Sequence, residues 1–163
     1  MKRAASLTLL ISLTALNLDA RELTSPDGKI VVAFDVTRGG GLGYRVAYRG
    51  QPILCESRLG LEAKNTSAFA EGFRVVNVAT ESHDETWRPV YGERSHIRDH
   101  YNQMAVDLED EQKPPRRLKL TFRAYDEGVA FRYTIPQQPG LDKIHLTREN
   151  SEFIFARLAD KKK

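Results

Sequence analysis

The sequence predicts an all-β fold in a single domain. After residue 20, apolar and polar residues alternate with a period of two in several short runs, the pattern of strands with one buried face. Turn-forming residues separate these runs at intervals of about 8 to 12 residues. No run of about ten residues after this point has a convincing helical period. Together these observations indicate a β-sandwich.

The first half of the chain contains predicted strands joined by recognisable turns. Ile30–Val36 alternates so that its apolar side chains share one face, and Leu42–Arg49 alternates in the same way. The glycine-rich residues Thr37–Gly41 between them predict a hairpin loop. Ser25–Gly28 has Pro at its second position and Gly at its fourth, as β-turns prefer. A short strand is predicted at Ile53–Leu54.

The second half continues the alternation. Asp126–Gly128 predicts a tight hairpin between two of its strands, and Glu109–Pro115 predicts a solvated turn. The predicted strands are Phe73–Thr80, one marked by Met104, Val106 and Leu108, then Leu118–Tyr125, Val129–Ile135 and a last one marked by Phe153 and Phe155.

Residues 1–20 have the features of a secretory signal peptide. Met1–Arg3 is basic, Ala4–Leu18 is uncharged, and Leu18–Ala20 places a small residue at the cleavage position. This apolar stretch is shorter than the ~20 residues that a transmembrane helix needs, and no second one follows. We therefore expect residues 21–163 to be the mature domain, exported to the periplasm, without a membrane span.

Composition excludes other classes. The formal net charge is +3, but residues 1–20 and the three terminal lysines carry more than that excess, which leaves the remainder close to neutral. No basic stripe with interleaved aromatic residues is present, so nucleic acid is not an expected partner. The lone Cys55 excludes an internal disulfide. Its neighbours Ile53 and Leu54 predict a buried thiol.

The alternation breaks between His83 and Asn102. This stretch contains the single Trp and three of the four His, together with many charged residues. In a loop displayed by a rigid sheet, aromatic faces can stack on sugar rings while polar side chains bond the hydroxyls. The composition suits equally well a salt-bridged cover over a sheet edge with Trp87 as its apolar anchor, or a face that docks another domain.

Metal and nucleophile chemistry has weaker support. His96 and His100 stand four apart, a spacing that aligns zinc ligands on a helix but not in a strand or loop. Arg94 and Arg98 would also repel a cation, so no metal ligand is predicted. Glu93 with either His could form an acid/base pair, as sugar mutarotation needs, but spacing does not bring them together. No Ser or Cys lies in a nucleophile motif.

Several separated blocks occur in an order that one family shares. They are Leu23–Lys29, Gly43–Val46, Ser57–Leu61, Trp87–Glu93, Arg98–Asn102, Arg123–Tyr133 and Glu149–Phe153. From Leu23 to Phe155 the chain resembles the N-terminal domain of glycoside hydrolase family 97, the α-glucosidase and α-galactosidase family of exported bacterial enzymes.

The resemblance implies a β-super-sandwich with the galactose-mutarotase-like fold. In the family this domain precedes a (β/α)8 barrel that carries the catalytic carboxylates and most ligands of a calcium ion. It therefore implies no catalytic residue, metal ligand or cofactor in this chain, and calcium only in a complete family member. The implied partners are an α-linked oligosaccharide and the barrel, in cis or in trans. The candidate substrate-binding residues are Trp87, Glu93, His100, Tyr101 and Asn102.

Other functions stay open. We expect a supporting domain of an α-glycosidase without hydrolytic activity of its own. Residues 156–163 lose the alternation, so we expect this domain to be truncated at its C-terminus. A stand-alone carbohydrate-binding module and a protein that docks a separate barrel are the alternatives. A small mutarotase would rest on fold analogy with Glu93, His96 and His100 alone.

Overall fold

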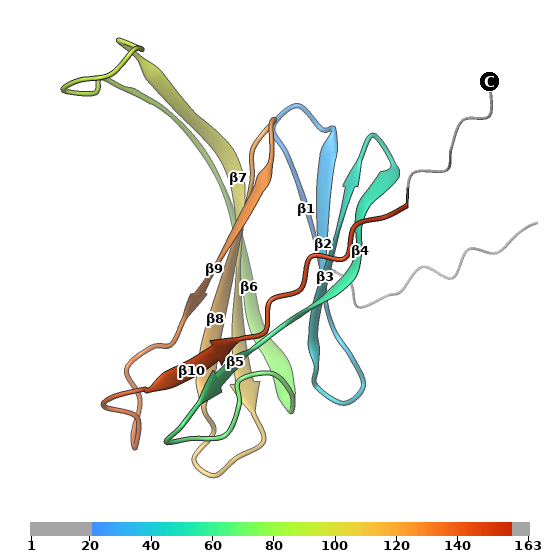
Figure 1. Cartoon of the computed structure of the whole chain (residues 1–163), viewed down its shortest axis with the longest axis vertical. Helices are drawn as coiled ribbons and strands as arrows, with labels where there is room; N and C mark the ends of the chain where they lie inside the picture. Colours follow the sequence, from blue (N-terminus) through green and yellow to red (C-terminus); the bar gives the residue numbers. More distant parts are fainter. Residues whose placement is uncertain (1–20, 158–163) are drawn as a thin grey trace, which may run out of the picture.

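The computed structural model describes residues 21–157, which form strands and loops without a helix (Figure 1). None of these residues lies in a helix that could cross a membrane. The expected signal peptide, residues 1–20, lies outside the described residues. The strands are β1 (Arg21–Thr24), β2 (Ile30–Val36), β3 (Leu42–Tyr48), β4 (Gln51–Leu59), β5 (Leu61–Ala63), β6 (Phe73–Trp87), β7 (Ile97–Asp110), β8 (Arg117–Ala124), β9 (Val129–Thr134) and β10 (Leu146–Glu149).

The strands form two four-stranded antiparallel sheets and a small two-stranded one. One sheet has the order β1-β2-β3-β4, the other β6-β7-β8-β9, and β5 pairs with β10. Consecutive strands are neighbours in both large sheets, so short turns suffice to connect them. The predicted turn at Ser25 is confirmed, because the backbone N–H of Gly28 donates to the Ser25 carbonyl over 2.9 Å. The Thr37–Gly41 hairpin is also confirmed, with Thr37 N–H donating to the Gly41 carbonyl.

The two large sheets pack face to face, which confirms the predicted all-β sandwich (Figure 1). Phe34 on β2 and Tyr44 on β3 meet Phe122 on β8, with ring centroids 5.6 and 6.2 Å apart. Phe131 on β9 packs 5.5 Å from Tyr44 and 6.1 Å from Phe122. Because Phe34 and Phe122 are fully buried, these aromatic side chains form the centre of the core.

Some predicted strand limits and one predicted burial are wrong. The last strand, expected at Phe153 and Phe155, is not a regular one: residues 150–156, which we call the C-terminal segment, bond to β4 at intervals, and Phe155 makes an isolated bridge with Leu54. Cys55 is exposed rather than buried. The pairing of β4 with β3 shifts register on both sides of Val46, where β4 has extra residues. Such a bulge turns a side chain off the inward alternation, so Leu54 points inward and Cys55 outward.

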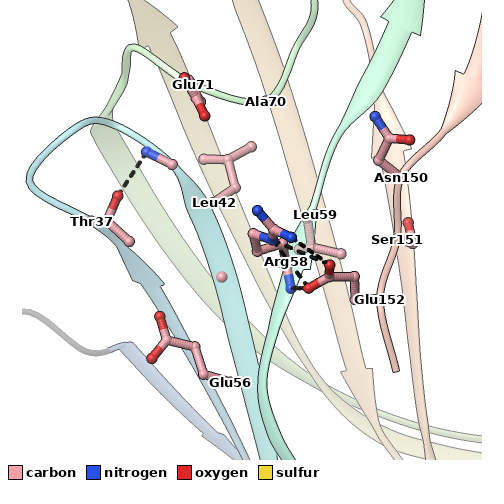
Figure 2. Close-up of a pocket in the computed structure, with 12 residues that line it drawn as sticks. Thr37, Leu42, Glu56, Arg58, Leu59, Ala70, Glu71, Asn150, Ser151 and Glu152 are labelled. Atoms are coloured by element: carbon pink, nitrogen blue, oxygen red, sulfur yellow. Dashed lines mark hydrogen bonds and ion pairs between the residues drawn. The ribbon is translucent and has the colours of Figure 1, made fainter. Parts of the chain in front are cut away.

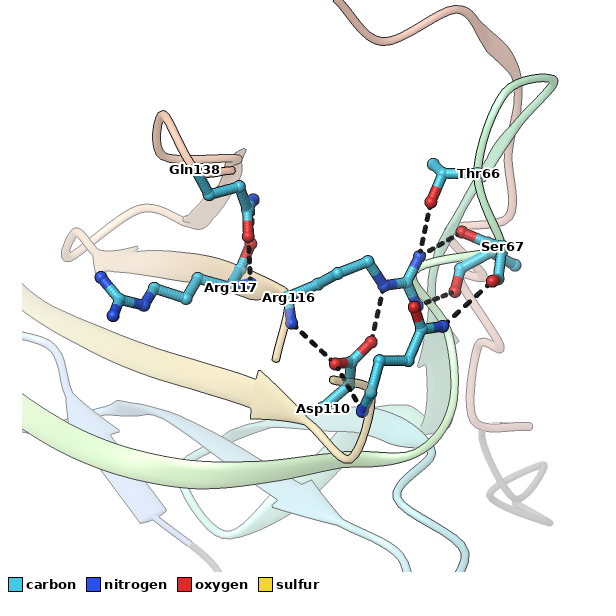
Figure 3. Close-up of polar contacts among 8 residues, drawn as sticks. Thr66, Ser67, Asp110, Arg116, Arg117 and Gln138 are labelled. Carbon is cyan, nitrogen blue, oxygen red and sulfur yellow. Dashed lines mark hydrogen bonds and ion pairs between the residues drawn. The ribbon is translucent and has the colours of Figure 1, made fainter. Parts of the chain in front are cut away.

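A buried ion pair fixes the turn between β7 and β8 (Figure 3). The Nε of Arg116 lies 2.6 Å from a carboxylate oxygen of Asp110, and both side chains are more than nine-tenths buried. The same guanidinium donates to the carbonyls of Ser67 and Ala68 and lies 4.5 Å from the Phe69 ring centroid. Arg116 therefore ties this turn to the loop between β5 and β6.

Candidate functional site

The predicted loop from His83 to Asn102 is mostly strand, so that prediction is wrong. β6 and β7 pair continuously out to Trp87 opposite Ile97, and the connecting loop is confined to residues 88–96. The outer part of this hairpin projects beyond the sandwich (Figure 1). We call residues 80–103 the ribbon. Both of its faces carry polar side chains, so no apolar alternation marks these strands in the sequence.

Strand geometry divides the predicted site residues between the two faces of the ribbon. Tyr101 pairs with His83, and Trp87 lies four residues further along the same face. His100 and Asn102 belong to the opposite face, opposite Asp84 and Ser82. Glu93 lies in the loop at the tip. The structure therefore does not bring the five predicted residues together into one site.

Tyr101 is the most buried of the predicted residues, with 5% of its surface exposed. Its ring stacks on His83, with centroids 4.8 Å apart, and lies 5.2 Å from Tyr125. The guanidinium carbon of Arg123 sits 4.1 Å from the Tyr101 ring centroid, and Arg123 donates to Gln103. Burial raises the pKa of the Tyr101 hydroxyl. Tyr101 thus anchors the base of the ribbon on β8.

The opposite face is held by polar contacts. The amide of Asn102 donates to the carbonyl of Thr24 on β1 over 2.8 Å. Two guanidinium nitrogens of Arg98 lie 2.7 and 2.6 Å from the two carboxylate oxygens of Asp84. These hydrogen bonds from Arg98 lower the pKa of Asp84. Cross-strand pairs of this kind stabilise a strand pair that has no apolar core of its own.

The exposed part of the predicted site lies at the tip. Trp87 is 47% exposed, and Val90 and Tyr91 in the loop are 99% and 90% exposed. Glu93 is exposed beside them. Five cavities of about 340–570 Å³ in the described part of the chain are lined by residues outside 78–106. The tip therefore presents exposed apolar side chains that can contact another body.

Two of the three histidines of the ribbon contact protein groups. The Nε of Arg88 donates to Nε2 of His96 over 2.9 Å, and the Ser95 hydroxyl lies 3.1 Å from Nδ1 of the same ring. His83 lies 3.6 Å from Glu85 and 3.8 Å from Asp99. Within residues 21–157, no group of three or more His, Cys, Asp or Glu side chains could hold a metal ion. The residues present do not fit a calcium site.

A polar cavity of about 530 Å³ lies elsewhere, beside β4 (Figure 2). Asn150, Ser151 and Glu152 line it from the C-terminal segment, and Glu56 and Arg58 line it from β4. The cavity forms where the C-terminal segment lies alongside β4 and continues the sheet. The Asn150 N–H donates to the Gly60 carbonyl and the Glu152 N–H to the Arg58 carbonyl, both over 2.8 Å.

An ion pair closes one wall of this cavity. A guanidinium nitrogen of Arg58 lies 2.9 Å from a carboxylate oxygen of Glu152, and the backbone N–H of Arg58 donates to the other oxygen. These hydrogen bonds from Arg58 lower the pKa of Glu152. The Tyr44 hydroxyl donates to the Glu152 carbonyl, while burial raises its pKa to about 12. Sequence reasoning did not predict this cavity, although both its segments lie in blocks that carry the resemblance.

Comparison with known proteins places the sandwich in one family. Residues 23–162 match the family model for the glycosyl-hydrolase 97 N-terminal domain. A retaining α-galactosidase of Bacteroides thetaiotaomicron is 27% identical over 158 residues, which are 95% of this chain and 22% of the relative. The chain therefore spans only about a fifth of the length of that relative.

Solved structures of family 97 enzymes are also similar to this chain. A glycoside hydrolase family 97 enzyme from Pseudoalteromonas sp. strain K8, in complex with acarbose, is 29% identical with a TM-score of 0.80, over 84% of this chain and 20% of that one. A variant of a family 97 enzyme from the same strain has been solved in complex with panose. A β-arabinopyranosidase is 27% identical with a TM-score of 0.76, over 83% and 21% of the two chains. The fold and the sequence match agree, and the chain belongs to glycoside hydrolase family 97, with the fold of its N-terminal domain.

Proposed function

We propose that this chain is the N-terminal β-sandwich part of an exported α-glycosidase and that it supports hydrolysis without carrying it out. One observation carries this proposal. The family match covers nearly the whole described chain, yet the chain spans only about a fifth of its relatives. The carboxylates that cleave the glycosidic bond, and calcium in a complete member, then belong to a (β/α)8 barrel in cis or in trans.

The substrate class follows from the relatives. One is a retaining α-galactosidase, and family 97 enzymes from one Pseudoalteromonas strain have been solved with panose and with acarbose. We propose an α-linked oligosaccharide as the substrate of the assembled enzyme. Residues 1–20, with their basic start and apolar stretch, support export to the periplasm.

The ribbon supplies the contact with the catalytic part in this proposal. Its tip projects from the sandwich, and Trp87, Val90 and Tyr91 expose apolar surface there. Exposed aromatic side chains on a projecting hairpin are typical of an interaction surface. Trp87 and Glu93 would then lie at the rim of the active site, where the sugar passes, while Tyr101, His100 and Asn102 hold the ribbon in place.

The activity of the purified chain tests the proposal. We expect no turnover of 4-nitrophenyl α-glucoside or α-galactoside, with a complete family 97 enzyme as the positive control in the same assay. Added catalytic barrel from such an enzyme should co-purify with the chain, and Tyr91→Ala should weaken that association. Turnover by the chain alone would contradict the proposal, because hydrolysis needs a correctly spaced carboxylate pair.

Tyr101 and Trp87 of the ribbon should respond differently to substitution. Tyr101→Ala should lower the free energy of unfolding by about 2–4 kcal/mol, because it removes a buried ring packed on His83 and Arg123. Trp87→Ala should change the stability by less than about 1 kcal/mol, because Trp87 is half exposed. In the assembled enzyme, Trp87→Ala should instead weaken the binding of panose. Urea unfolding and calorimetric titration measure the two effects, and equal loss of stability in both variants would contradict the assignment.

A further inference from the structure

The C-terminal segment, residues 150–156, forms the outer edge of the β1–β4 sheet in the described part of the chain. Its even-numbered residues bond to β4: Glu152 N–H to the Arg58 carbonyl, the Ile154 carbonyl to Cys55 N–H, and Ala156 N–H to the Ile53 carbonyl. In an antiparallel pair the intervening residues direct their backbone groups to the other side. No partner is found within residues 21–157 for the backbone groups of Ser151, Phe153 and Phe155.

Apolar side chains lie along this edge. Phe155 is 71% and Phe153 57% exposed, although Phe153 stacks on Phe131 with centroids 6.0 Å apart. A cavity of about 520 Å³ adjoins them, with Tyr48, Ile53 and Val129 among its lining residues. In Figure 1 the segment runs from β10 along β4 toward the end of the chain. The edge therefore combines unpaired backbone with uncovered aromatic surface.

The charge along the edge favours an identical strand as its partner. Glu152 is the one charged residue in the stretch 150–156, and its own Arg58 neutralises it. No Lys or Pro of the kind that protects exposed edges lies in this stretch. The outer edge strand of the other sheet, β6, carries Glu81 and Glu85, and two such edges would repel each other.

We propose that this edge pairs with the same edge of a second copy of the chain. Antiparallel pairing about a twofold axis at Phe153 places Phe153 opposite its counterpart and Ser151 opposite Phe155 of the other copy. Every outward N–H then meets an outward carbonyl. The axis is perpendicular to the sheet, so Phe153 and Phe155 of both copies share one face and cover each other. The result is a continuous sheet across the dimer.

A proline substitution at the edge tests the pairing. Phe155→Pro removes an N–H that the monomer does not use, and strands tolerate proline at such positions. We expect the purified chain to sediment as a dimer, and Phe155→Pro to raise its dissociation constant by at least about tenfold, while the melting temperature of the dilute monomer stays unchanged. Phe155→Ala keeps the N–H and should have a smaller effect. Hydrogen exchange at the Phe153 amide should slow at least about tenfold on dimerisation.

A control separates edge pairing from general stickiness. Val90→Ser removes a fully exposed apolar side chain at the ribbon tip, far along the chain from the edge, and should leave the dimer unchanged. A monomer at all concentrations would overturn the proposal and leave the edge to a strand of another polypeptide. A dimer that Phe155→Pro does not weaken, or that Phe155→Ala weakens equally, would also overturn it.

Discussion

Replacement of Arg116 by alanine is expected to lower the free energy of unfolding by about 3–5 kcal/mol. Its guanidinium is the partner of the buried Asp110 carboxylate and of the carbonyls of Ser67 and Ala68 (Figure 3). Alanine leaves a buried negative charge and buried acceptors without donors, and each is costly in a low-dielectric site. The cation–π contact with Phe69 is lost as well.

The neighbouring arginine provides a matched control. Arg117 has an exposed side chain and a longer contact of 3.5 Å with Glu109, and exposed pairs of this kind contribute little. Arg117→Ala should change the free energy of unfolding by less than about 0.5 kcal/mol. Urea denaturation of both variants measures the difference. Equal destabilisation would mean that the Arg116 side chain is hydrated and that its buried network does not exist in solution.

The same pair makes stability depend on pH. Burial raises the pKa of Asp110, but hydrogen bonds from the backbone and guanidinium of Arg116 and from the Gln112 backbone outweigh it, so the pKa is lowered. A carboxyl group whose pKa is lower in the folded state than in the unfolded state stabilises the fold at pH values above its unfolded-state pKa. This stabilisation is lost as the pH falls through the folded-state pKa. The difference in the free energy of unfolding between wild type and Arg116→Ala should therefore become smaller as the pH falls. A difference that stays constant from pH 7 to pH 2 would contradict the pairing of Arg116 with Asp110.

The sequence predicts those parts of the fold in which one face of a strand is buried and the other is exposed. The alternation in β2 reflects deeper burial of the face that carries Ile30, Val32 and Phe34, and its observed limits coincide with the prediction. Both faces of the outer parts of β6 and β7 are exposed to solvent. Their polar sequence therefore resembles that of a loop, although the pairing of the two strands continues to Trp87. β5 and β10 escaped prediction because each is very short and their pairing joins residues far apart in the chain.

The candidate site was less predictable than the fold. Density of aromatic and charged residues identified the ribbon, but assigning its side chains to faces requires knowing that they lie in strands. Tyr101 and Asn102 are adjacent in sequence and therefore point to opposite faces. The cavity beside Arg58 and Glu152 depends on a contact across more than 90 positions. No local pattern encodes such a contact, and only the resemblance drew attention to both segments.

Truncation of the central aromatic cluster should have an effect as large as the loss of Arg116. Phe122 is fully buried and contacts Phe34 on the facing sheet and Phe131 on its own sheet. Phe122→Ala removes a ring at the point where the two sheets meet and leaves a cavity that β-strands, fixed by their ladders, cannot collapse to fill. We expect the free energy of unfolding to fall by about 3–5 kcal/mol.

An exposed aromatic residue shows whether this loss comes from the core. Tyr91→Ala removes a ring of similar size that is 90% exposed at the ribbon tip, so its effect should stay within about 0.5 kcal/mol. Phe122→Leu should recover more than half of the loss, since leucine fills most of the space. Recovery by leucine, with no effect at Tyr91, means that tight packing between the sheets stabilises the domain. If Phe122→Ala costs less than about 1 kcal/mol, the two sheets do not pack in solution as they do in Figure 1, and the sandwich is loosely held.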